Sequence, residues 1–142
     1  MSSRPKVTLS DYRALSEFRY QIRRYLELAD AGAKAADLPP RQYQLLLAVK
    51  GLPEGTEPTI RTLAERLGVR HHSAVELVDR LEQRGLVQRE RNESHRSFVF
   101  VRITRKGESI LEKLVALRKA DLQTAGPILV KALTTLTKKD RP

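Results

Sequence analysis

The side chains best suited to chemistry in this 142-residue chain gather in one short run, Arg-His-His-Ser at residues 70–73, with Glu76 three residues further on. Arginine donates to phosphate or guanine, histidine and serine donate to phosphates or base acceptors, and a carboxylate accepts from the amino group of cytosine. The alternative for Glu76 is an ion pair with Arg80, four residues along the same helix. The run predicts a polar surface that contacts nucleic acid.

The sequence holds no recognisable catalytic or metal-binding arrangement. Ser73 beside two histidines lies on one exposed helix, without a glycine-rich turn to supply an oxyanion hole. Adjacent histidines point in different directions, and only Glu76 stands at helical spacing from His72, so we expect no metal. The chain has no cysteine, which excludes thiolate sites, and no glycine-rich phosphate-binding loop. We expect no cofactor and no enzymatic activity.

The charge balance points to a polyanionic partner. Lysine and arginine number 27, aspartate and glutamate 17, and the net charge is +10. Half of this excess lies in residues 59–106, where eleven basic side chains, ten of them arginine, accompany six acidic ones. Such a balance favours nucleic acid first and an anionic membrane surface second, with a solvated surface of mixed charge as the alternative.

The composition is typical of a globular domain, with 40% hydrophobic and 31% charged residues. No stretch approaches the ~18 uninterrupted apolar residues that a membrane span requires. The first residues lack the apolar core of a signal peptide. We expect a cytoplasmic protein with no membrane partner.

Apolar residues recur at steps of three and four in most of the chain, which predicts helices. Ser10 is the predicted cap of the first helix and Gly32 its end, whereas Thr59 and Gly68 bracket a short third helix. Gly126-Pro127 is expected to break the C-terminal segment into two helices. The predicted helices cover residues 9–30, 40–50, 60–67, 71–84, 105–125 and 128–136.

The period changes to two after Gly85. Residues 86–91 and 98–103 alternate or are rich in β-branched and aromatic side chains, and a polar turn separates them, so they predict a β-hairpin. Two short helices joined by a glycine turn and followed by a hairpin are the parts of a winged helix-turn-helix. In that arrangement the second short helix enters the major groove, and the hairpin lies alongside as the wing.

The sequence of these parts resembles the MarR family of bacterial transcription regulators. The resemblance rests on Leu-Ala-Glu-Arg-Leu-Gly-Val at 63–69, Ser-Ala-Val at 73–75 and the run 77–87, and it continues through Ile103-Thr104 and Gly107. It covers about residues 38–111, with helices on both sides where the family keeps its dimerisation helices. It implies a mainly α fold with a small β-hairpin wing, divided into an N-terminal dimerisation helix at 1–37, a DNA-binding lobe at 38–104 and C-terminal dimerisation helices at 105–142.

The wing departs from the family pattern. The family usually carries an aspartate immediately before the arginine that inserts into the minor groove. Here the arginine is Arg96, with His95 immediately before it and Ser97 after it. Arg96 remains the candidate minor-groove reader, but the carboxylate that would orient it is missing. Neutral His95 cannot replace that carboxylate.

The resemblance and the charge pattern together nominate the residues that contact DNA. Any one of these cations has solvation as its alternative. The candidates are Arg61, Arg70, His71, His72, Ser73, Glu76, Arg80, Arg89, Arg91, His95 and Arg96.

A crevice between the dimerisation helices and the DNA-binding lobe often takes small aromatic or anionic effectors in the family. Arg19, Tyr20, Arg23 and Arg24 on the first helix are the candidates here, with dimer contacts as the alternative. The predicted function is a homodimeric regulator, expected to be a repressor, that binds a pseudo-palindromic operator in double-stranded DNA. The other hypothesis is a winged-helix interaction module in a protein or RNA complex.

Overall fold

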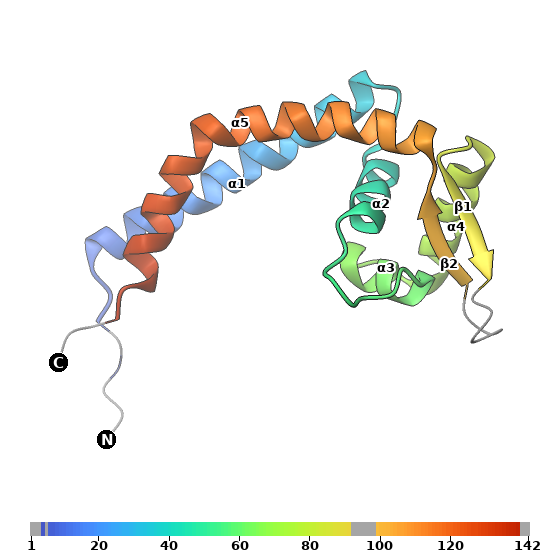
Figure 1. Cartoon of the computed structure of the whole chain (residues 1–142). Helices are drawn as coiled ribbons and strands as arrows, with labels where there is room; N and C mark the ends of the chain where they lie inside the picture. The colour runs from blue at the N-terminus through green and yellow to red at the C-terminus, as the bar shows by residue number, and fades with distance from the viewer. Residues whose placement is uncertain (1–3, 5, 92–98, 140–142) are drawn as a thin grey trace. The chain divides into compact units, whose positions relative to one another are not determined.

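The computed structural model describes residue 4, residues 6–91 and residues 99–139 (Figure 1). Those residues form five helices and one two-stranded antiparallel sheet. The chain divides into two compact units, one made of the residues up to Ala29 and from Ala116 onward, the other of Asp30–Val115. The elements are α1 (Leu9–Ala35), α2 (Pro40–Lys50), α3 (Ile60–Leu67), α4 (His71–Gln83), β1 (Val87–Arg91), β2 (Val99–Ile103) and α5 (Arg105–Thr137).

The unit of residues 30–115 is built around the winged helix-turn-helix that the sequence predicts. α2, α3 and α4 pack together, and the β1–β2 hairpin closes the same core. The core is aliphatic, and removing it from water is the main stabilising contribution to this lobe. Its largest fully buried side chains are Leu38, Leu45, Leu46, Leu63, Leu81, Leu86, Val78, Val87 and Val101.

The short helices begin and end where their capping residues predict. Thr59 accepts a hydrogen bond from the backbone N–H of Thr62 (3.1 Å) and starts α3. Gly68 ends it in the left-handed conformation, with φ of 67°. Pro40 opens α2 and Gly51 caps its end. On α2, Leu47 is 40% exposed, whereas Gln42 and Leu45 are buried.

The hairpin pairs Val87 with Ile103 at one end and Arg91 with Val99 at the other. Its second strand, β2, is also bonded to the loop before α3, because the N–H of Val101 donates to the carbonyl of Pro58 (2.9 Å). This contact ties the base of the wing to the loop that starts the helix-turn-helix. The predicted turn at residues 92–97, with His95 and Arg96, lies outside the described residues.

Helix α1 begins at Leu9, the first residue of the predicted range, but its capping residue lies two residues before the predicted one. Thr8, not Ser10, is the cap, since the N–H of Asp11 donates to Thr8 Oγ1 (3.2 Å). The N–H of Thr8 in turn donates to the Asp11 carboxylate (2.9 Å). This reciprocal pair satisfies two backbone donors at once, which a cap at Ser10 would not do.

The end of α1 is also later than predicted, because the helix runs through Gly32 to Ala35. The left-handed residue is Asp37, with φ of 58°. The N–H of Leu38 donates back to the carbonyl of Ala33 (2.9 Å), and both side chains are almost fully buried. Aspartate tolerates this conformation, and the buried Ala33–Leu38 contact makes this a better helix end than Gly32.

The predicted break at Gly126-Pro127 is wrong, since α5 is one helix from Arg105 to Thr137 with Pro127 inside it. A proline inside a helix costs about 3 kcal/mol. However, α5 is held on both sides of the proline: before it, Arg118 donates to the carbonyl of Leu28 on α1 (2.8 Å), and after it, Ala132 is only 5% exposed. Packing along α1 therefore outweighs the local preference for a break.

Candidate nucleic-acid interface

Helix α4 buries one face and presents the other to solvent. Ala74, Val78 and Leu81 recur at steps of four and three, and all three are fully buried. The opposite face is therefore exposed, and it carries His72 and Glu76. The sequence and the structure agree that α4 presents a polar, water-facing surface.

The start of α4 is free to receive an anion. Arg70 is the capping residue, and its side chain makes no cap hydrogen bond. Arg70, His71 and His72 are exposed, and the first turn carries no acidic residue. Unpaired backbone N–H groups and the helix dipole both favour a negative group at such an end.

The turn between α3 and α4 is short and tightly bonded. The N–H of Val69 and the N–H of Gly68 donate to the carbonyls of Ala64 (3.0 Å) and Glu65 (3.2 Å). Ala64 is 6% exposed, so its small side chain lies where the helices approach. This turn determines where the first residues of α4 lie on the surface.

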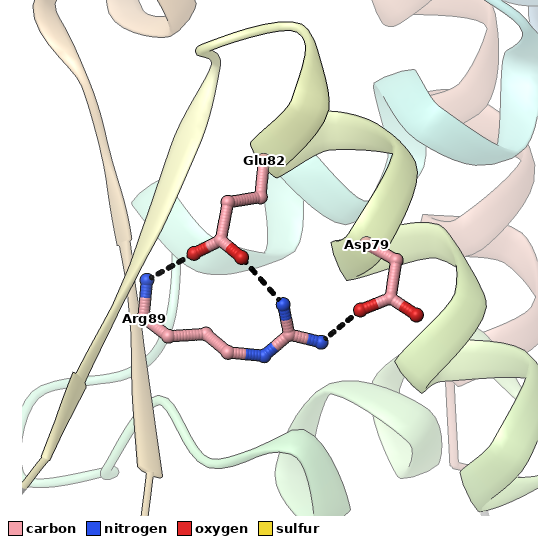
Figure 2. A network of polar contacts seen from close by, with 3 residues as sticks. All are labelled: Asp79, Glu82 and Arg89. Atoms are coloured by element: carbon pink, nitrogen blue, oxygen red, sulfur yellow. Dashed lines mark hydrogen bonds and ion pairs between the residues drawn. The ribbon is translucent and has the colours of Figure 1, made fainter.

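Arg89 joins the wing to α4 (Figure 2). Its Nη1 donates to Oε1 of Glu82 (2.8 Å) and its Nη2 to Oδ1 of Asp79 (2.5 Å). The backbone N–H of Arg89 donates to the other oxygen of Glu82 (3.0 Å). We call Asp79, Glu82 and Arg89 the wing clasp. It connects strand β1 to two successive turns of α4, and all three bonds involve a charged group.

The wing clasp gives Arg89 a different role from the phosphate contact that the sequence proposed. Burial lowers the pKa of Arg89, but the hydrogen bonds and negative charges of Asp79 and Glu82 outweigh it and raise the pKa above its ordinary value. The Arg89 side chain is 25% exposed, and the bonds of its guanidinium are directed at α4. We interpret Arg89 as the residue that holds the wing against α4.

The other predicted cations of the lobe are more open. Arg61 is 87% exposed and lies 3.9 Å from Glu65, while Arg80 and Arg91 are exposed. Within the part of the chain that the structure describes, Glu76 forms no ion pair with Arg80. Ser73 is half-buried on the flank of α4. His95 and Arg96 lie outside the described residues, so their roles at the wing tip stay predictions.

Three arginines have partners that the sequence did not suggest. Arg84, at the end of α4, donates to Gln42 Oε1 (3.0 Å) and to the carbonyl of Asp37 (2.9 Å). Arg102 donates to Glu90 (3.1 Å) across the hairpin. Arg41 on α2 donates to the carbonyl of Leu67 (3.3 Å). Arg84 and its partners are 42 and 47 residues apart, and no local pattern in the sequence signals such pairs.

The candidate effector residues lie on the exposed side of α1. Tyr20 is 45% exposed, and the guanidinium carbons of Arg23 and Arg24 lie 5.6 and 5.7 Å from the centre of its ring. Arg23 also pairs with Glu27 (2.6 Å), and Arg19 is exposed. A hollow of about 370 Å³ between α1 and α5 is lined by Arg24, one of the nominated residues, but not by Arg19, Tyr20 or Arg23.

Neither a metal-binding cluster nor a membrane-crossing helix is present in the described residues. They contain no cluster of three or more histidine, aspartate or glutamate side chains that could hold a metal ion. Among them, no helix has the length and apolar character needed to cross a membrane.

Comparisons with known proteins show which family the chain is similar to. Residues 36–96 match the model of the MarR family. No curated protein sequence matches the chain significantly. A MarR-family protein from Bacillus stearothermophilus is 23% identical, with a TM-score of 0.72 over 94% of this chain and 100% of that one.

Two further solved structures carry ligands. A MepR variant from S. aureus bound to an oligodeoxyribonucleotide is 19% identical, with a TM-score of 0.66 over 93% of this chain and 100% of that one. CouR from Rhodococcus jostii, bound to p-coumaroyl-CoA, is 21% identical, with a TM-score of 0.59 over 83% and 87% of the two chains. The resemblance and the fold class that the sequence predicts are confirmed.

Proposed function

We propose that this chain, whose winged-helix lobe belongs to the MarR family, is a transcription regulator that binds double-stranded DNA as a homodimer. The exposed outer face of α4 is the observation that carries the proposal. Its first turn joins Arg70 and two histidines to uncapped backbone N–H groups, and this combination suits base edges and phosphates. The family consists of DNA-binding regulators without enzymatic activity, and such a regulator works in the cytoplasm.

The apolar surface of the unit made from α1 and α5 supports the dimer. In its described residues the unit exposes eleven large apolar side chains, and exposed apolar surface of this extent is typical of an interface. A second copy that covers this surface would present two α4 helices to half-sites about 34–36 Å apart on one face of the duplex. The exposed apolar side chains are Val7, Leu9, Tyr12, Leu15, Tyr20, Leu26, Leu28, Leu117, Ile128, Val130 and Leu133.

Repression and its relief follow from the same arrangement. A dimer seated on a pseudo-palindromic operator blocks access to the promoter. A small aromatic or anionic effector bound by the dimerisation helices would change the reach of the two α4 helices and weaken DNA binding. Arg19, Tyr20, Arg23 and Arg24 remain our candidates, and Arg24 lines the α1–α5 hollow. CouR bound to p-coumaroyl-CoA is a structural neighbour that holds an aromatic, anionic ligand.

Selection of bound duplexes from a random pool tests the function. We expect enrichment of an inverted repeat with half-sites about one helical turn apart. Sedimentation of the complex should give two chains per selected duplex. A pool that yields no enriched motif, with retention of RNA or protein instead, would support the alternative of an interaction module.

Replacement of Arg70 by alanine tests base reading. The side chain makes no cap bond, so the variant should fold normally. We expect affinity for the selected duplex to fall about fivefold, with a smaller loss on random duplex, because a contact to a base edge carries about 1–3 kcal/mol of discrimination. Fluorescence anisotropy on both duplexes measures the ratio. Equal losses on the two duplexes would make Arg70 a phosphate contact instead.

A further inference from the structure

A small hollow opens on the flank of α4, on the side of α2. It has a volume of about 290 Å³, and it combines polar side chains from two helices with an apolar floor. Arg41 comes from the first turn of α2, and the other polar groups come from successive turns of α4. The lining residues are Arg41, Val69, Ser73, Glu76, Leu77 and Arg80.

Two guanidinium groups of the hollow retain free donors. Arg41 is exposed and uses its Nη1 on the carbonyl of Leu67 (3.3 Å) and on Gln44 (3.5 Å). Arg80 is exposed, and it forms no ion pair with any residue that the structure describes. Each guanidinium has five N–H donors, so most of them remain available to a ligand. Ser73 adds a hydroxyl on the same face of α4 as Arg80.

The net charge of this lining indicates the ligand. Two arginines and Glu76 leave one positive charge, which matches the single negative charge of a phosphodiester. Glu76 has no ion-pair partner among the described residues, and its carboxylate disfavours a ligand with more negative charge. Asp79 and Glu82, the other acidic groups of α4, are engaged by the wing clasp.

We propose that this hollow seats one backbone phosphodiester of the duplex, with Arg41 and Arg80 donating to it from opposite sides. The inference rests on the proposed function, and it adds α2 to the DNA-contacting elements. The strand would then be held on the α2 side of α4, while the wing lies on the other side. Arg41 becomes a positioning residue that sets the register of α4 in the groove.

Two variants of Arg41 and a control that removes the same charge elsewhere provide the test. The variants are Arg41→Gln, Arg41→Lys, and Arg105→Gln, which removes an equal charge from a residue outside the hollow. DNA affinity is measured against salt concentration on selected and random duplexes. For Arg41→Gln we expect a loss of about fivefold on both duplexes, and a slope of log K against log salt that is shallower by about 0.9, the value for one phosphate. Arg41→Lys should retain the slope.

A neutral phosphate in the DNA locates the contact. Single phosphates of the selected duplex are replaced in turn by a neutral methylphosphonate. At one position we expect wild type and Arg41→Gln to bind equally, because the variant has already lost its contact with that phosphate. If Arg41→Gln keeps the wild-type slope, or if Arg105→Gln reduces it equally, the inference is overturned while DNA binding stands. A wild-type protein without salt-dependent DNA binding would overturn the proposed function itself.

Discussion

Asp79→Asn is expected to weaken binding to duplex DNA about tenfold, although it removes a negative charge from a surface that meets phosphates. Asp79 holds one arm of Arg89, and Arg89 connects strand β1 to α4 (Figure 2). Isolated surface ion pairs contribute only about 0–1 kcal/mol. Here two charge-assisted bonds share one guanidinium, and a third joins the backbone N–H of Arg89 to Glu82, so the loss of one partner loosens the wing as a unit. A factor of ten corresponds to about 1.4 kcal/mol.

Glu76→Gln is the matched control, since it makes the same charge change on the same helix at a residue without an ion-pair partner among those described. Simple electrostatics predicts about twofold tighter binding for both variants. The wing clasp predicts tighter binding for Glu76→Gln and weaker binding for Asp79→Asn. Arg89→Lys retains the charge but not the fork geometry, and it should resemble Asp79→Asn. Anisotropy titrations that find all three variants unchanged or tighter would rule out the wing clasp as a positioning device.

Gly107→Ala is expected to destabilise the winged-helix lobe by about 3 kcal/mol or more. A Cβ built at Gly107 would lie 2.2 Å from the carbonyl oxygen of Leu86 and 2.9 Å from Cγ1 of Ile103. The carbonyl belongs to the backbone, and it already accepts a hydrogen bond from the N–H of Thr104 (3.0 Å). It therefore cannot move away without straining that bond. Overpacking of this kind costs typically 1–3 kcal/mol and occasionally more. Thermal unfolding should show Tm lowered by about 10 °C.

Gly126→Ala is the control for the helix that both glycines share. Its added Cβ would meet nothing within 4 Å, and the residue has no positive φ. Alanine in a helix is more stable than glycine by about 0.5–1 kcal/mol, so Tm should rise slightly. If Gly107→Ala is as stable as the wild type, the close approach of α5 to the carbonyl of Leu86 is wrong.

Local signals predicted the elements that depend on local chemistry. Thr59 and Gly68 bracket α3 as expected, because a side-chain cap and a left-handed glycine act within a few residues. The signals failed where tertiary packing decides. Pro127 lies inside α5, and Gly32 lies inside α1. Both positions are local helix breakers whose cost is outweighed by side chains packed elsewhere along the same helix.

In the candidate site, too, the sequence predicted what depends on local signals and missed what depends on tertiary packing. The exposed first turn of α4 was predictable, because periodicity alone tells which residues are buried and which face water. The role of Arg89 was not, since it depends on the distance between a strand and a helix that only the folded lobe determines. The hollow beside Arg41 was missed for the same reason, because its lining comes from two helices about 30 residues apart in the chain.

The salt dependence of DNA affinity tests most directly the central claim that α4 and its flanking arginines dock on a duplex. Binding of the intact chain to its selected duplex should be measured from low to high salt. We predict a straight line of log K against log salt, with a slope of about −5 or steeper, as expected when about six phosphates are neutralised. A slope near zero would contradict the account, because it would mean that no phosphate is neutralised on binding.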